Sequence, residues 1–127
     1  MDLSALTAQL IEFRDQRDWA QFHSLRNLIV SLNLEAGELL ELTQWKSDTE
    51  MALLIDSAAG LEALRDECAD VLIYLLLIAE QAGINLEDAA YAKLAKNAAR
   101  YPVGISYGSN HKSAPTPIPV ATGRSES

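Results

Sequence analysis

The sequence predicts an all-α protein, a four-helix bundle-like protomer that is completed by oligomerisation. Apolar residues recur at the i, i+3 and i+4 spacing of helices, and no stretch alternates as a strand does. All four prolines lie at or beyond position 102, so none interrupts a helix before that point. With 127 residues, we expect one domain over residues 1–103 and a flexible tail rich in Pro, Ser and Gly over residues 104–127.

The first half of the chain predicts two helices. The first covers Ser4 to Gln16 and has Leu10 and Phe13 on its apolar face. Ser24 follows a short junction and suits the N-cap of a second helix, because a serine oxygen can accept a hydrogen bond from a free amide of the first turn. The apolar pattern of this second helix continues to about Lys46.

The second half predicts a connector and two further helices. Residues 47–60 form a connector, either irregular or with a short helical turn, to a third helix over residues 61–81, which ends before Gly83. A fourth helix covers residues 86–100 and stops at Pro102. Residues 71–79 are apolar on every side of the third helix, so one small domain cannot cover them. We therefore expect a homo-oligomer, either a dimer or a dimer of dimers.

Composition limits the partners and the compartment. A net charge of −8 argues against binding to a nucleic-acid polymer, although it permits nucleotides that arrive with a cation. The longest apolar run has nine residues, which is too short to span a bilayer. A single cysteine, Cys68, excludes an intrachain disulfide, and we expect it to be buried. With no signal-peptide pattern after Met1, we expect a cytoplasmic protein.

Two acidic pairs are the main functional signal. Glu35 and Glu38 lie three residues apart on the second helix, as do Glu67 and Asp70 on the third. Residues at this spacing share a helix face, so antiparallel helices would bring all four acids together. Four carboxylates stay ionised at close range only with a compensating cation, and hard divalent ions prefer oxygen ligands. The pattern predicts a Mg²⁺ site whose partner is a nucleotide.

Aromatic and basic residues suggest where a nucleotide would bind. Trp19, Phe22 and Trp45 flank the second helix, where they fit either core packing or stacking on a nucleobase. A polar set on and after the fourth helix fits either a solvated face or phosphate binding. This set is Lys93, Asn97, Arg100 and Tyr101.

Other chemistries lack their motifs. Di-iron carboxylate bundles use Glu-x-x-His pairs, but neither His23 nor His111 follows a glutamate by three residues. The sequence contains no P-loop and no glycine-rich dinucleotide motif. No base partner is indicated for a nucleophilic serine or cysteine.

The motifs together resemble the MazG-like all-α nucleotide pyrophosphohydrolases, and within them the dCTP pyrophosphatase branch. The resemblance covers about residues 6–103. In its first half it rests on Arg17-Asp18-Trp19, Phe22-His23, Arg26-Asn27-Leu28, Glu35-x-Gly37-Glu38-Leu39 and Gln44-Trp45-Lys46. In its second half it rests on Glu67-Cys68-Ala69-Asp70, the following Val71-Leu72-Ile73-Tyr74-Leu75, Lys93, Asn97 and Arg100-Tyr101-Pro102.

This resemblance implies Mg²⁺-dependent hydrolysis of a (deoxy)nucleoside triphosphate, dCTP or a modified dCTP, to the monophosphate and pyrophosphate, a reaction that cleans the nucleotide pool. It implies a homotetramer with sites built between subunits. It also implies residue roles, with the four acids as metal ligands and catalytic groups. Trp19, His23 and Trp45 would surround the base and sugar, and Tyr74, Lys93, Asn97 and Tyr101 would lie near the sugar or phosphates.

One position departs from the family pattern. The animal enzymes have a base-contacting histidine on the first helix where this chain has Leu10, so the resemblance does not imply strict cytosine preference. A non-catalytic helical oligomer, acting as a nucleotide sensor or a scaffold, is the alternative interpretation. It predicts folding without metal and no turnover.

Overall fold

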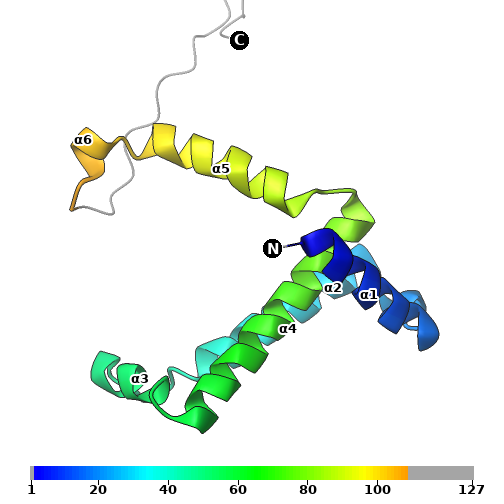
Figure 1. Ribbon diagram of the computed structural model, residues 1–127, viewed down its shortest axis with the longest axis horizontal. Coiled ribbons are helices and arrows are strands. Elements are labelled where there is room, and N and C mark those ends of the chain that lie inside the picture. Colours follow the sequence, from blue (N-terminus) through cyan, green and yellow to red (C-terminus); the bar gives the residue numbers. More distant parts are fainter. Residues whose placement is uncertain (1, 109–127) are drawn as a thin grey trace, which may run out of the picture. The chain divides into compact units, whose positions relative to one another are not determined.

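The computed structural model describes residues 2–108, and every regular element within them is helical, which confirms the all-α class (Figure 1). The described residues divide into two compact units, with the boundary between Leu86 and Glu87. In chain order the elements are α1 (Leu3–Gln16), the 3₁₀ turn η1 (Ala20–Phe22), α2 (Leu25–Glu41), α3 (Asp48–Leu54), α4 (Ala58–Ala82), α5 (Leu86–Arg100) and α6 (Val103–Ser106).

The first unit is organised around α2 and α4, which run antiparallel along each other, while α1 packs against α4. Gln81 joins the end of α4 to the start of α2. In the amide orientation that satisfies both groups, its side-chain nitrogen donates to the His23 carbonyl oxygen at 2.9 Å. Its oxygen accepts from the Leu25 amide at 3.3 Å. Antiparallel packing places the C-terminal half of α2 beside the N-terminal half of α4, and the acidic pairs lie in these two halves.

Most helix ends follow the predicted signals. The Ser24 hydroxyl accepts from the Asn27 amide at 3.1 Å and caps α2 as expected. Gly83 ends α4 with φ 68°, a left-handed conformation that glycine adopts at little cost. In the second unit, α5 covers the predicted residues 86–100.

The end of α2 differs from the prediction, and the connector contains a short helix, the alternative that the sequence left open. Helix α2 stops at Glu41 instead of continuing to Lys46, because the chain turns and Trp45 adopts a φ of 61°. The connector contains the separate helix α3, which begins with a capping box. In this box the Ser47 hydroxyl accepts from the Glu50 amide, and the Glu50 carboxylate accepts from the Ser47 amide.

Helix α4 begins three residues earlier than predicted and includes Gly60 in its first turn. A Cβ at this position would collide with the Leu54 carbonyl oxygen at the end of α3. Glycine is therefore required for the close approach of α3 and α4.

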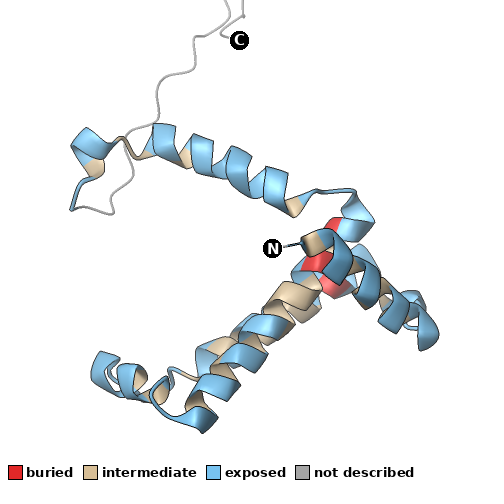
Figure 2. Cartoon of the chain, viewed as in Figure 1, coloured by how far each residue is buried: buried red, intermediate tan, exposed pale blue. Residues whose placement is uncertain are grey.

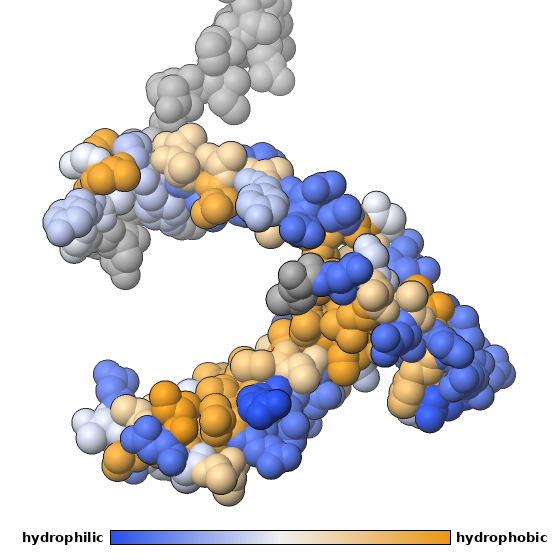
Figure 3. Space-filling view, viewed as in Figure 1, coloured by the Kyte–Doolittle hydropathy of each residue, from blue (hydrophilic) through white to orange (hydrophobic). Residues whose placement is uncertain are grey.

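The first unit buries few side chains by itself. The buried residues gather where α1 and α2 meet the C-terminal half of α4 (Figure 2), and they are Leu28, Leu76, Leu77 and Ala79. Apolar surface remains exposed along α4 on the face in view (Figure 3). Cys68 is also exposed, so the prediction that it is buried was wrong for the single chain. Residues 71–79 of α4 are apolar around the whole helix, but α1 and α2 cover only part of this stretch.

Within residues 2–108, no single helix is both long and apolar enough to cross a membrane; α4 and α5 reach such a length and composition only when they are counted together. Helix α6 lies at the start of the predicted tail. The rest of that tail, residues 109–127, falls outside the described residues.

Candidate active site

The four predicted acids converge in the first unit. Glu35 and Glu38 extend from α2, and Glu67 and Asp70 extend from α4. One carboxylate oxygen from each lies within 4.8 Å of the others. This convergence follows from the i, i+3 spacing on two antiparallel helices, as the sequence indicated. The assignment of these residues as metal ligands stays a prediction.

The cluster is electrostatically unfavourable without a cation. Burial raises the pKa of Glu35, and a hydrogen bond and repulsion from Glu38 raise it further. Burial also raises the pKa of Glu67, and repulsion from Glu38 adds to the effect. One oxygen of Glu35 and one of Glu67 are buried, and no hydrogen-bond donor reaches either oxygen from the described residues. Buried carboxylate oxygens without a donor are costly, so the cluster has unused capacity to bind a cation.

The donor set fits Mg²⁺. All four groups offer carboxylate oxygens, the ligand type that Mg²⁺ prefers. Three of the residues are partly buried and Glu38 is exposed, so the cluster has an open side. Mg²⁺ usually keeps several waters and binds substrate phosphates together with a few carboxylates, and an open carboxylate cluster suits that mode.

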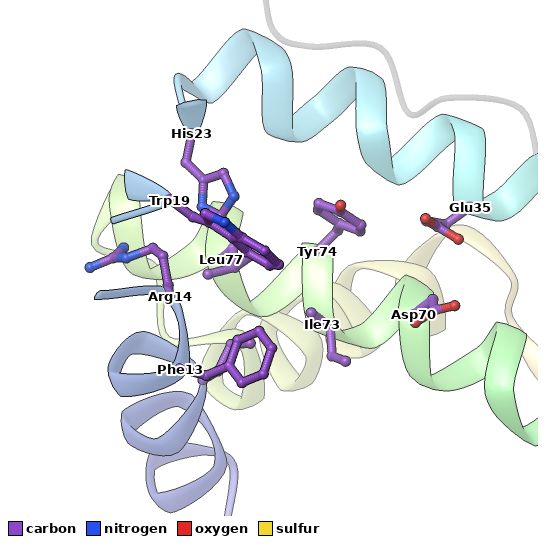
Figure 4. Close-up of a pocket in the computed structure, with 10 residues that line it drawn as sticks. Phe13, Arg14, Trp19, His23, Glu35, Asp70, Ile73, Tyr74 and Leu77 are labelled. Carbon is purple, nitrogen blue, oxygen red and sulfur yellow. The ribbon is translucent and has the colours of Figure 1, made fainter. Parts of the chain in front are cut away.

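A pocket of about 160 Å³ adjoins the cluster (Figure 4). Glu35 and Asp70 belong to both the pocket and the cluster. Trp19 and His23 lie at the other end of the pocket, and Tyr74 lies between that end and the two acids. The full lining is Leu10, Phe13, Arg14, Trp19, His23, Glu35, Asp70, Ile73, Tyr74 and Leu77. The pocket thus joins an apolar, aromatic end to an acidic end.

His23 contributes a polar atom to the apolar end. Its Nδ1 is buried, and no hydrogen-bond partner reaches it from the described residues. Burial lowers the pKa of His23, and the charge of Arg14 lowers it further, so the imidazole is neutral at neutral pH. A neutral imidazole can donate from one nitrogen and accept at the other, which suits hydrogen bonding to a heterocyclic ligand.

The remaining predicted binding residues do not line this pocket. Trp45 lies in the turn after α2 and is 90% exposed. Lys93 and Asn97 are on α5 of the second unit, and Tyr101 follows that helix, with its amide donating to the Asn97 carbonyl oxygen at 2.8 Å. The roles of these residues in binding stay predictions.

The pocket also contains residues that the sequence did not single out for function. Phe13 was expected on the apolar face of α1, a position equally consistent with core packing. Arg14 pairs with Asp15 at 2.8 Å and with Glu80 of α4 at 3.5 Å. The contact with Glu80 joins residues far apart in the sequence, so no local pattern could have indicated it.

Comparisons with known proteins show which family the chain belongs to. The model of the MazG-like family matches residues 30–113. Relatives named dCTP pyrophosphatase 1 are 47% identical in Mus musculus, over 77% of this chain and 58% of that protein, and 43% identical in Homo sapiens, over 80% and 59%. The chain therefore spans less than two thirds of the length of these relatives.

A solved structure shares the fold. The crystal structure of a pyrophosphatase from Archaeoglobus fulgidus superimposes with a TM-score of 0.71 at 41% identity, and the match covers 77% of this chain and 90% of that chain. The family match includes α4, most of α2 and all four acids of the cluster. On these grounds the chain belongs to the MazG-like family.

Proposed function

We propose that this chain is a Mg²⁺-dependent nucleoside triphosphate pyrophosphohydrolase. It hydrolyses a (d)NTP, dCTP or a modified dCTP, to the monophosphate and pyrophosphate, and so removes unwanted nucleotides from the pool. The observation that carries the proposal is the pocket, which shares Glu35 and Asp70 with the four-acid cluster. A base at the apolar end would place its phosphates toward the acids. The names of the relatives support the choice of base.

The acids would hold the metal and handle the proton of the reaction. Mg²⁺ bound by Glu35, Glu38, Glu67 and Asp70 would neutralise phosphate charge and polarise the α-phosphorus. A water oxygen forms the new bond to the α-phosphorus while the bond to the bridging oxygen of the β-phosphate breaks, which releases pyrophosphate. We assign acceptance of the proton from this water to Glu38, the exposed member of the cluster.

Other residues would bind the nucleotide. The Trp19 indole, 44% exposed in the pocket wall, offers a flat face for stacking on the base. His23 would hydrogen-bond the base, and Tyr74, which lies between the aromatic end and the acids, would contact the sugar. By family resemblance, Trp45 would add to the base site. Lys93, Asn97 and Tyr101 would hold the sugar or phosphates.

We further propose that the protein is a homotetramer, a dimer of dimers. The single chain leaves large apolar side chains exposed on both long helices, among them Leu34 at 65%, Leu40 at 68% and Leu75 at 36%. Monomeric proteins rarely expose contiguous apolar surface on this scale, and such surface usually marks an interface. Analytical ultracentrifugation should give four times the monomer mass of 13.9 kDa. A monomer at micromolar concentration would contradict this assignment.

A panel of dNTPs and NTPs, including base-modified dCTP, tests the activity. We expect release of pyrophosphate together with the monophosphate in Mg²⁺, and none after chelation by EDTA. Glu38→Gln should lose turnover, and Glu62→Gln, at an exposed glutamate outside the cluster, should keep it. Release of inorganic phosphate would instead indicate attack at the γ-phosphorus. If folded, metal-loaded protein hydrolyses no nucleotide, the chain is a nucleotide sensor or scaffold.

A further inference from the structure

We propose that Arg17 and Asp18 are positioning residues that hold the Trp19 indole in the wall of the pocket. The inference deepens the proposed function, because it assigns a cause to the orientation of the ring on which a nucleobase would stack. Neither Arg17 nor Asp18 lines the pocket. Both therefore act on a ligand through Trp19 and not by direct contact.

The first support is aromatic. The rings of Phe13 and Trp19 meet edge to face, with centroids 5.6 Å apart and an interplanar angle of 75°. The Arg17 guanidinium carbon lies 3.6 Å from the Phe13 centroid and 6.0 Å from the Trp19 ring. Both distances are within the range of cation–π attraction, so one cation contacts both rings. Phe13 and Trp19 line the pocket, so Arg17 supports that wall from outside.

The Arg17 side chain is itself fixed. Its Nη1 donates to the Phe13 carbonyl oxygen at 2.9 Å, one turn earlier on the same helix. This bond caps the end of α1 and sets the guanidinium over the Phe13 ring. An arginine with one end hydrogen-bonded and its plane on a ring has lost most of its rotamer freedom, so it can restrain the neighbouring indole.

The second support is the backbone that leads to Trp19. Asp18 has a φ of 54°, which L-residues seldom adopt and which asparagine and aspartate tolerate better than most. Two hydrogen bonds from the Gln21 side chain hold this turn, one to the Asp18 carbonyl oxygen and one to its carboxylate, both at 3.0 Å. The turn also returns the Trp19 amide to the Arg14 carbonyl oxygen at 3.1 Å.

The consequence is a preorganised ring. Trp19 follows the end of α1 and is 44% exposed, so packing alone restrains it little. A ring that must be ordered when the ligand binds lowers affinity, whereas a ring already held in place does not. Loss of the restraint should weaken nucleotide binding without changing the chemical step, because the acids that perform that step are untouched.

Arg17→Met and Arg17→Lys test the aromatic support. The matched control is Arg26→Met, which changes an exposed arginine of α2 that does not line the pocket. Asp18→Ala and Asp18→Asn test the turn. Two properties are measured on the full chain. One is the ordering of Trp19 without nucleotide, from acrylamide quenching and near-ultraviolet circular dichroism, with Trp19→Phe identifying its signal. The other is the change in KM and in kcat for dCTP.

We expect Arg17→Met to increase quenching of Trp19 and to raise KM about two- to fivefold, the range of an exposed cation–π contact, with kcat nearly unchanged. Arg17→Lys should recover part of the loss. Asp18→Asn should have the quenching and KM of the wild type, and Asp18→Ala should show the same increases in both as Arg17→Met. If Arg17→Met fails to fold, the two Asp18 variants decide by the same measurements.

If folded Arg17→Met shows the same quenching of Trp19 and the same KM as the wild type, the proposal is overturned. Equal losses of kcat and helicity would also overturn it, because they would indicate a merely structural role. If the wild type hydrolyses no nucleotide, the proposed function fails, but quenching of Trp19 in nucleotide-free protein still decides whether Arg17 and Asp18 position the ring.

Discussion

Replacing Glu35 by glutamine should stabilise the metal-free protein and abolish its activity. The carboxylate oxygens of the cluster lie within 4.8 Å of one another, so each neighbouring charge repels Glu35 by about 1 kcal/mol at a water-like dielectric. That dielectric is appropriate because the residue is only partly buried. Burial opposes the Glu35 charge as well and raises its pKa. A neutral amide of nearly the same shape removes both penalties.

Three neighbouring charges set an upper limit of about 3 kcal/mol, but salt and water screen repulsion between partly exposed groups. The net gain should therefore be about 1 kcal/mol, which corresponds to a rise in melting temperature of roughly 4 °C. Thermal unfolding in EDTA at neutral pH and a fixed protein concentration measures this gain. Glu62→Gln, outside the cluster, should change the melting temperature little. In Mg²⁺ the wild type should have the higher melting temperature, because it gains the binding energy of the ion, whereas Glu35→Gln has lost a ligand.

Two results would refute this reasoning. If metal-free Glu35→Gln were less stable than the wild type, the four acids would not repel one another in the folded protein. If the variant kept full turnover, Glu35 would be neither a metal ligand nor a catalytic group. A residue whose removal increases stability and destroys activity is retained for function, and a surface glutamate shows neither effect.

Three further outcomes are expected. In the folded state the pKa values of Glu35 and Glu67 are raised above the ordinary 4.5, so the folded state binds more protons than the unfolded state. The stability of the metal-free protein, measured by urea titration, should therefore fall as pH rises above that value, and Mg²⁺ should remove this trend. Leu28→Ala, at a residue 2% exposed, should cost about 2–5 kcal/mol in the same titrations. Gly60→Ala should cost about 1–3 kcal/mol, because its Cβ meets the carbonyl at the end of α3; wild-type stability would contradict that contact.

Local rules explain what the sequence predicted well. The acidic pairs could be placed together because a spacing of three fixes a helix face. The Ser24 cap and the left-handed Gly83 follow from the chemistry of single residues. The caps depend on neighbours within one turn, whereas the meeting of the two acidic pairs also required the assumption that the two helices pack antiparallel.

The remaining features depend on contacts between distant segments or on competing local signals. Helix α2 ends at Glu41 although the following residues are compatible with a helix, and Trp45 is left-handed despite its bulk. Gly60 was assigned to the connector, yet it lies in the first turn of α4, where the close approach of α3 requires glycine. The pocket combines α1 with α4, and periodicity could not distinguish Phe13 as a pocket residue from Phe13 as a core residue. The capping box of α3, by contrast, is readable in the sequence from Ser47 and Glu50.

The central claim is that the acid cluster directs water to the α-phosphorus of a nucleotide bound in the adjoining pocket. A single turnover with dCTP and Mg²⁺ in water labelled with heavy oxygen, followed by mass spectrometry of both products, tests it most directly. We predict that the label appears in the monophosphate and that pyrophosphate is unlabelled. Label in pyrophosphate would place the attack on the β-phosphorus, and label in inorganic phosphate would place it on the γ-phosphorus; either result would contradict the account.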